Sequence, residues 1–251
     1  MFSKKHYFAN LKTNTLGYQF SYFESLASTN DLIWEVNAPN PINGQCILAE
    51  EQTRGRGRRG NTWKSTPGKS LTFSIIIDTP LQPEQFGLIS LVAGISVANA
   101  IKECTNLRIS LKWPNDILLN EKKTGGILTE SRKINSQYKI AIGVGLNVNE
   151  IKIPLSLKNV ATSLKLESKK NIKRELLLAN ILNNLESDLH LNAGEISYKW
   201  AQYCIHNNKT VSFHFDKSVI SGKFKGITDN GHAVLDIAGE KKIFSAGVIE
   251  I

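Results

Sequence analysis

The hydrophobic pattern divides the chain into a long stretch of mixed strands and helices and a shorter stretch of strands alone. Apolar residues recur at helical spacing over 84–104 and 172–191, which predicts two helices, each with a buried face. Shorter helices are expected at 29–37 and 195–205. Runs of β-branched and other apolar residues predict strands at 18–23, 45–50, 70–77, 107–113, 116–120, 124–131 and 137–146.

The character of the chain changes at Lys209. Apolar and polar residues alternate over 211–215, and turn sequences at 229–231 and 238–240 separate further short strands. About 43 residues form this all-β segment, too few for a dependable core of their own, so the segment should pack on the rest of the chain. We therefore predict an α+β protein.

Two domains are expected, a larger one over 1–207 and a small β domain over 208–251. Within the larger domain, a hairpin turn is predicted at 120–122, between two of the expected strands. Neither an internal repeat nor a low-complexity linker interrupts the pattern.

Composition restricts the class of protein. Of the 251 residues, 41% are hydrophobic and 21% are charged, which excludes a collagen, a wholly disordered chain and a disulfide scaffold. The formal net charge is +9, so an anionic partner is expected: nucleic acid, a phosphorylated ligand or an acidic protein.

The cellular setting follows from cysteines and hydropathy. Cys46, Cys104 and Cys204 are odd in number and far apart, which favours a reducing cytoplasm. Residues 1–20 have no apolar core typical of a secretory signal. The most apolar stretch, 88–101, is too short and too rich in Ser, Gly and Asn to span a bilayer, so no membrane association is predicted.

A glycine- and arginine-rich segment at 54–60, the Arg/Gly loop, satisfies the pattern G-x-G-x-x-G. A dinucleotide-binding fingerprint is excluded, because that motif needs a helix to begin within it and the residues after Gly60 cannot form one. Gly68-Lys69-Ser70 is not a P-loop, because Trp63 stands where a glycine is required.

The charge around the loop suggests its chemistry. Residues 52–77 contain six Lys or Arg and neither Asp nor Glu. A disordered RNA-binding segment is the simpler explanation of such a sequence, but this one lies between two predicted strands. Glycine allows mobility and close approach, and arginine presents forked donors to phosphate, so we interpret it as a mobile loop that closes on a polyphosphate or phosphoanhydride.

Four other short motifs could carry chemistry, and each has an ordinary structural alternative. Ser28-Thr29-Asn30 precedes a predicted helix, where Ser and Thr often act as N-caps. Residues 112–116 combine a cation, an aromatic ring, an amide and a carboxylate around a proline, although Pro-Asn-Asp is also common turn chemistry. Lys123 precedes paired glycines, or is a solvated lysine at a sheet edge. Residues 143–147 end a strand with small residues and an amide.

The histidines show no metal-ligand spacing, so no zinc site is predicted.

Taken together and in this order, these motifs resemble the biotin–protein ligase family. The resemblance covers about residues 18–251 and implies a mixed-sheet biotin/lipoate ligase-like catalytic domain with a small C-terminal SH3-like β-barrel. It also implies a two-step reaction. Biotin and ATP form biotinoyl-5′-AMP and pyrophosphate, with Mg²⁺ screening the phosphates, and a lysine of a biotin carboxyl carrier protein then takes the biotinoyl group. Acetyl-CoA carboxylase or another biotin-dependent carboxylase is the implied partner.

The resemblance assigns roles residue by residue. The implied biotin-binding residues are Ser28, Thr29, Asn30, Gln52, Gly55, Arg56, Gly57, Arg58, Lys123, Gly125 and Gly126. The implied ATP-binding residues are Arg56, Arg58, Arg59, Trp63, Lys112, Asn115, Asp116, Lys123 and Asn147. Lys123 and Arg58 are the expected catalytic residues, and Asp116 is the expected magnesium contact.

Two departures from the family pattern matter. About 17 residues precede the first predicted strand, too few for a helix-turn-helix module, so sequence-specific DNA binding is not expected. Asn61 stands where some members have another arginine, which leaves loop closure and a linked homodimer open. The alternatives are a lipoate–protein ligase and, in a different class, a basic nucleic-acid-binding module, whose affinity would depend on salt.

Overall fold

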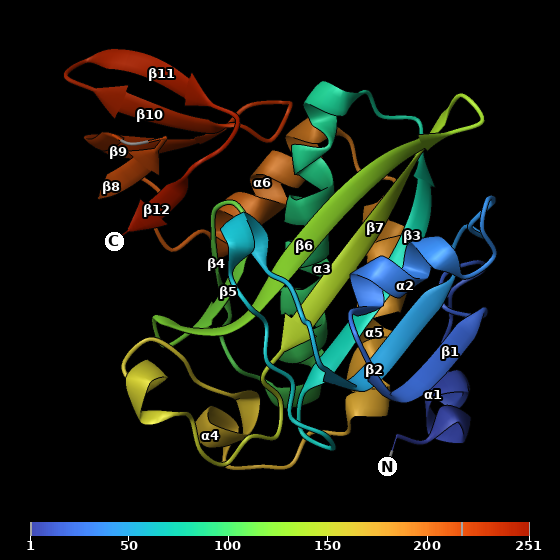
Figure 1. Ribbon diagram of the computed structural model, residues 1–251. Coiled ribbons are helices and arrows are strands. Elements are labelled where there is room, and N and C mark those ends of the chain that lie inside the picture. The colour runs from blue at the N-terminus through green and yellow to red at the C-terminus, as the bar shows by residue number, and fades with distance from the viewer. Residues whose placement is uncertain (1, 217, 251) are drawn as a thin grey trace.

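A computed structural model describes residues 2–216 and 218–250. Its larger sheet has seven strands in the order β1-β2-β3-β7-β6-β5-β4 (Figure 1). Only β1 and β2 run parallel, and the other neighbours are antiparallel. In chain order the strands are β1 (Phe20–Leu26), β2 (Cys46–Gln52), β3 (Leu71–Thr79), β4 (Ser110–Lys112), β5 (Asp116–Leu119), β6 (Lys122–Ile134) and β7 (Gln137–Leu146).

Helices cover both faces of this sheet. The long helix α3 packs with α5 and α6 on one face, and α2 lies across β2, β3 and β7 on the other (Figure 1). The helices are α1 (Lys4–Asn10), α2 (Thr29–Glu35), α3 (Gly87–Thr105), α4 (Leu164–Ser168), α5 (Arg174–Asp188) and α6 (Ala193–Tyr203). Short 3₁₀ turns are η1 (Arg58–Gly60), η2 (Pro83–Gln85) and η3 (Leu155–Leu157).

Strand β3 shows why the central strands are rich in apolar residues. Phe73, Ile75 and Ile77 join the main core, whereas Ile76 joins a smaller core beneath α2 that also contains Trp34. A strand buried on both faces needs apolar residues on each of them, so its sequence is not a simple apolar–polar alternation. The exceptions are Thr72 and Ser74, which are also buried and belong to the site described below.

The smaller sheet has five antiparallel strands in the order β11-β10-β9-β8-β12. They are β8 (Thr210–Phe215), β9 (Ser218–Ile227), β10 (Ala233–Ile237), β11 (Glu240–Phe244) and β12 (Val248–Glu250). The predicted turn at 238–240 joins β10 to β11, with Ala238 and Gly239 both at positive φ. The predicted α+β class, with a mixed sheet and a small all-β unit, is therefore confirmed.

Most expected elements are present, with a few differences, one of which is that the short helix α4 was not predicted. The strand expected at 107–113 is reduced to β4. Helix α1 was not predicted, and its Tyr7 is buried in the main core beside Phe2. Finally, the helical segment 83–105, which comprises η2 and α3, extends slightly beyond the expected 84–104. By length and composition this segment could cross a membrane, but 72% of its most apolar window is buried inside the protein. We therefore interpret it as a core helix.

The segment that joins the two sheets contains a buried histidine. His206 is 0% exposed, and its ring packs edge-on against Phe224 with the ring centroids 4.2 Å apart. Within the described residues, neither ring nitrogen has a hydrogen-bond partner. Burial, with smaller contributions from Lys112 and Lys209, lowers the pKa of His206 from 6.5 to about 3.

Acid should therefore destabilise the fold through His206. The unfolded chain takes up this proton near pH 6.5 and the folded chain near pH 3. The free energy of unfolding therefore decreases as the pH is lowered through that window, by about 1.4 kcal/mol per pH unit. We expect urea unfolding at pH 7 and pH 5 to show a loss of about 2 kcal/mol that is absent in His206→Phe. An equal loss of stability in the wild type and in His206→Phe would show that His206 does not cause the acid sensitivity.

Candidate active site

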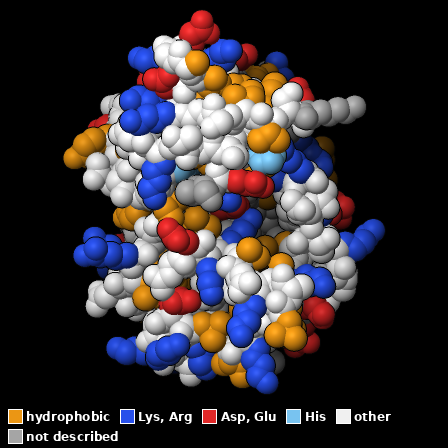
Figure 2. Space-filling model, turned by 90° about the vertical axis from the view of Figure 1, so that its left-hand side faces the viewer, with side chains coloured by type: hydrophobic (Ala, Val, Ile, Leu, Met, Phe, Trp, Pro, Cys, Tyr) orange, Lys and Arg blue, Asp and Glu red, His pale blue; other side chains and the backbone are white. Residues whose placement is uncertain are grey.

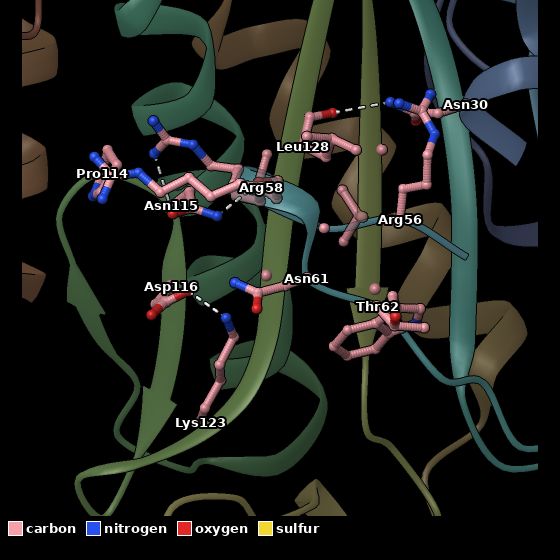
Figure 3. A pocket seen from close by; sticks show the side chains of 18 of the residues that line it. Asn30, Arg56, Arg58, Asn61, Thr62, Pro114, Asn115, Asp116, Lys123 and Leu128 are labelled. Atoms are coloured by element: carbon pink, nitrogen blue, oxygen red, sulfur yellow. Dashed lines mark hydrogen bonds and ion pairs between the residues drawn. The ribbon is translucent and has the colours of Figure 1, made fainter. Parts of the chain in front are cut away.

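A cavity lies where the loops of the larger sheet meet the smaller sheet. Its walls come from the start of α2, the Arg/Gly loop, residues 112–116, the middle of β6, the C-terminal end of β7, and Gly247 with Val248 from the C-terminal unit. We call it the first cavity, and Figure 3 shows part of its lining. The predicted site residues that line it are Ser28, Thr29, Asn30, Gln52, Arg56, Gly57, Arg58, Arg59, Trp63, Lys112, Asn115, Asp116, Lys123 and Gly126.

The segment Ser28–Asn30 forms the polar end of the first cavity. Ser28 stands at the N-cap of α2, but its side chain makes no capping hydrogen bond, although it is buried against the cavity. The backbone N and the Oγ1 of Thr29 both donate to Oε1 of Gln52, at 2.6 and 3.0 Å. The N-cap explanation of this motif therefore does not account for the Ser28 hydroxyl, which faces the cavity.

Ser74 on β3 completes this polar end. Its Oγ lies 2.7 Å from Oγ1 of Thr29 and 2.6 Å from Oδ1 of Asn30. The Asn30 amide donates to the Leu128 carbonyl at 3.3 Å (Figure 3). It also donates to Oε2 of Glu130 at 2.8 Å. These hydrogen bonds fix the orientation of the Asn30 side chain, so the polar groups of this wall are held in place.

Two glycines of β7 make room for side chains at the site. A Cβ on Gly143 would overlap Oδ1 of Asn30, and a Cβ on Gly145 would overlap the ring of Trp63. The Trp63 ring thus lies directly on β7, and its Nε1 donates to Oγ1 of Thr72 at 3.2 Å. These glycines are therefore part of the site, and the simple strand-end explanation of residues 143–147 is insufficient.

Substitution of Gly143 by alanine should disrupt the polar end of the first cavity. The added methyl group would push Asn30 away from Ser74, while the backbone of β7, which is a regular strand here, accepts alanine. We expect a loss of ligand affinity of about tenfold or more, the factor for one or two lost hydrogen bonds. Isothermal titration should measure it, with Gly194→Ala, at an exposed position in the first turn of α6, as the control. Unchanged affinity in Gly143→Ala would contradict the assignment.

The Arg/Gly loop forms a hairpin over the first cavity. Arg56 bridges to Thr62, the Gly57 amide donates to the Asn61 carbonyl at 2.7 Å, and Trp63 N donates to Gly55 O. Gly55 itself is outside the cavity lining, and a Cβ there would overlap the Trp63 carbonyl, so its role is to let the hairpin close.

The two arginines of the hairpin have different partners. Arg56 contacts Asp31 and Glu130 on the α2 side of the first cavity. On the other side, Nη1 of Arg58 lies 3.3 Å from Oδ1 of Asn115 (Figure 3). Burial lowers the pKa of Arg58, and the neighbouring Arg59 lowers it further. Arg58 is thus a desolvated cation, which interacts more strongly with an anion than an exposed one does.

Asp116 and two lysines form a charged cluster at the far end of the first cavity. Lys123 Nζ lies 2.5 Å from one carboxylate oxygen of Asp116 (Figure 3). Lys112 Nζ lies 3.5 Å from the other. The paired strands explain this meeting: Lys112 pairs with Asp116 across β4 and β5, and Asp116 with Gly126 across β5 and β6. A Cβ on Gly126 would contact the end of Lys123.

A second cavity adjoins the first, and both share a wall of Thr62, Trp63, Lys112, Asp116 and Lys123. Asn147 lines only the second cavity, where its amide donates to the Thr162 carbonyl at 3.0 Å. Gly125 lines neither cavity and packs against Leu146. Among the described residues, no cluster of three or more His, Cys, Asp or Glu could hold a metal ion.

Sequence reasoning missed several site residues. Thr62, Gly247 and Val248 line the first cavity, and Asp31, Thr72, Ser74 and Glu130 form hydrogen bonds with predicted site residues. Of these, Ser74 carries the clearest local signal, because it is a polar residue within a largely apolar, buried strand.

Comparison with known proteins gives the family. Residues 22–147 match the model of the biotin/lipoate A/B protein ligase family. The Bacillus subtilis "bifunctional ligase/repressor BirA" is 32% identical over 95% of this chain and 76% of the relative. The Mycobacterium tuberculosis "biotin–[acetyl-CoA-carboxylase] ligase" is 30% identical over 91% of this chain and 87% of the relative.

The fold agrees with this match. A solved structure of the biotin protein ligase from Aquifex aeolicus in complex with biotin and ATP superposes with a TM-score of 0.78. Its sequence identity is 29%, and the superposition covers 93% of this chain and 98% of that one. The chain therefore belongs to the biotin/lipoate A/B protein ligase family and, within it, to the biotin–protein ligases.

Proposed function

We propose that this protein activates biotin with ATP as biotinoyl-5′-AMP and transfers the biotinoyl group to a lysine of a biotin carboxyl carrier protein. The observation that carries the proposal is the Lys112–Asp116–Lys123 cluster, which lies in the wall shared by the two cavities. A reaction that joins two anions needs cationic groups at their meeting point. Relatives named for ligation to acetyl-CoA carboxylase support the carrier assignment.

In this proposal the first cavity holds biotin. Ser28, Thr29, Asn30 and Gln52 supply hydroxyl and amide groups for its polar ring, and the carboxylate points toward Lys123. The second cavity holds the nucleotide between Trp63 and Asn147. The biotin carboxylate then attacks the α-phosphorus of ATP, and pyrophosphate leaves.

Lys123 and Arg58 have complementary roles in this first step. The Lys123 ammonium lies between the two anionic groups and reduces their repulsion, and Arg58 adds a desolvated cation beside Asn115. The same charges stabilise the AMP that departs when the carrier lysine attacks the mixed anhydride.

Magnesium enters this scheme as part of the MgATP substrate. Such an ion typically binds one or two carboxylates together with phosphate oxygens and water. Asp116 supplies a carboxylate at the shared wall, and the bound phosphates would draw the neighbouring lysines from it.

The surface charge bears on the alternative of a nucleic-acid-binding module. On the face shown in Figure 2, Lys and Arg side chains are interspersed with Asp and Glu. On this face, the basic side chains behind the net charge of +9 therefore alternate with acidic ones. A nucleic-acid-binding module would concentrate its Lys and Arg in a patch or stripe, so the ligase is favoured over that alternative.

Isotope exchange between pyrophosphate and ATP tests the proposal. Exchange should require biotin, and an equal concentration of lipoate should support little or none. Exchange that depends on lipoate as much as on biotin would overturn the substrate assignment, and no exchange with either would overturn the adenylation step.

Arg58→Ala should release the intermediate prematurely. Biotinoyl-AMP is a reactive mixed anhydride that must be kept from water until the carrier arrives, and Arg58 closes the hairpin over it through Asn115. We expect free biotinoyl-AMP to accumulate in solution and carrier-independent biotinylation of added proteins to rise. Arg54→Ala, at the start of the loop and outside the lining of the first cavity, is the control. If Arg58→Ala released biotinoyl-AMP at the wild-type rate, Arg58 would not be the residue that retains the intermediate.

A further inference from the structure

Arg56 lines the first cavity and is held there by two carboxylates. Its Nη1 lies 2.9 Å from Oε1 of Glu130, and its Nη2 lies 3.1 Å from Oε2 of Glu130 and 2.5 Å from Oδ1 of Asp31. Glu130 raises the pKa of Arg56 further, because its hydrogen bonds favour the charged guanidinium. The guanidinium therefore has anionic partners within the protein itself.

Glu130 also connects this ion pair to the polar wall. Its Oε2 accepts from the Asn30 amide at 2.8 Å, and Asp31 follows Asn30 directly in the first turn of α2 (Figure 3 shows Arg56 extending toward Asn30). One carboxylate thus contacts both the Arg/Gly loop and the segment Ser28–Asn30. A change in loop position would be transmitted to Asn30 through this group.

We infer that Asp31 and Glu130 act as positioning residues, forming a latch with Arg56 that holds the Arg/Gly loop closed over the first cavity and aligns Asn30. The latch rests on the proposed function only in naming biotin as the ligand beneath the loop. It assigns Arg56 to loop closure, whereas Arg58, on the opposite side, faces the reacting groups.

The partial exposure of the latch makes it reversible. The side chains of Arg56, Asp31 and Glu130 are 44%, 46% and 30% exposed, so water and salt compete with the ion pairs. A latch of this strength allows the loop to open for substrate entry and product release, which a fully buried pair would prevent.

Limited proteolysis of the ligand-free protein tests the latch. Asp31→Asn, Glu130→Gln and the double variant leave every tryptic site of the loop intact, and the Glu130→Gln side chain keeps an oxygen for the Asn30 amide. We expect cleavage within 54–60 to be roughly threefold to tenfold faster in the double variant, the range for partly exposed ion pairs. About 1 M salt should accelerate cleavage of the wild type toward the same rate.

Two controls keep the result specific. Glu84→Gln, an exposed carboxylate on η2 far from the loop, should leave cleavage unchanged, and thermal melting should show that all variants are folded. Cleavage of the double variant at the wild-type rate, or no response of the wild type to salt, would overturn the latch.

Kinetics distinguish a latch from a merely structural role. Glu130→Gln should raise KM for biotin about threefold to tenfold with little change in kcat for adenylation, because the groups around Lys123 are untouched. A fall in KM would show instead that the carboxylates compete with a substrate anion for Arg56, and would overturn the proposal. If the wild type shows no biotin-dependent exchange, the proposed function fails and proteolysis alone decides the latch.

Discussion

Lys123→Met is expected to reduce biotin adenylation by on the order of 10²–10³-fold, the cost of removing one preorganised charge-stabilising donor. Lys123 Nζ lies beside Asp116 in the wall shared by the two cavities, where the carboxylate and the phosphate would meet. Methionine keeps the approximate length and the apolar stem but removes the charge. Pre-steady-state formation of biotinoyl-AMP, at saturating biotin and ATP, measures the effect directly.

Lys122→Met is the matched control. Lys122 is the preceding residue on β6, lines neither cavity, and directs its Nζ to the Lys158 carbonyl at 3.3 Å. It should therefore keep a nearly wild-type rate. If Lys123→Met is folded and adenylates biotin as fast as Lys122→Met, then Lys123 is only a solvated lysine at a strand end.

Arg174→Met is expected to lower the free energy of unfolding by about 3–5 kcal/mol, the usual cost of removing one partner of a buried ion pair. Arg174 Nη1 and Nη2 donate to the two carboxylate oxygens of Glu50 at 2.8 Å each, and both side chains are less than 8% exposed. Burial opposes ionisation of Glu50, but hydrogen bonds from Arg174 and Gly68 outweigh it and lower the pKa of Glu50. Without Arg174, the Glu50 charge would remain buried and only partly compensated.

Chemical denaturation at pH 7 measures this loss. Lys173→Met, an exposed neighbour at the N-cap of α5, is the control and should change stability little. A loss below about 1 kcal/mol in Arg174→Met would mean that water or a rearranged side chain compensates Glu50. The ion pair ties β2, which ends at Gln52, to α5, so its loss should also affect the polar wall of the first cavity.

The sequence predicted best what depends on local pattern. The period of apolar residues identified α3 and α5, and the turn residues at 120–122 and 238–240 lie in hairpins as expected, with Asn120 and Glu121 at positive φ. The family resemblance implied that the Ser28 and Lys112 segments belong to one site, and the sheet brings both to the first cavity.

What the sequence could not predict depends on contacts between distant segments. Arg56 reaches Glu130 across 74 residues, and Gly143 matters only because Asn30 lies over it. Helix α1 lacks a repeated apolar pattern, since its seven residues bury only Tyr7. Nothing local indicates such partners, because the antiparallel order of β3, β7 and β6 creates them.

Four expectations stay predictions: the roles of the individual site residues, the domain boundary at 207–208, the homodimer, and the absence of sequence-specific DNA binding. The proposed chemistry depends on the roles assigned to the site residues.

Transfer of biotin to an acceptor tests the central claim most directly. The purified protein is incubated with ATP, magnesium, biotin and an isolated biotin carboxyl carrier domain, and the domain is analysed by intact-mass and peptide mass spectrometry. We predict that one biotinoyl group is added to a single lysine, only when ATP and biotin are both present, and that lipoate does not replace biotin. An acceptor that stays unmodified, or one that accepts lipoate as readily, would contradict the account.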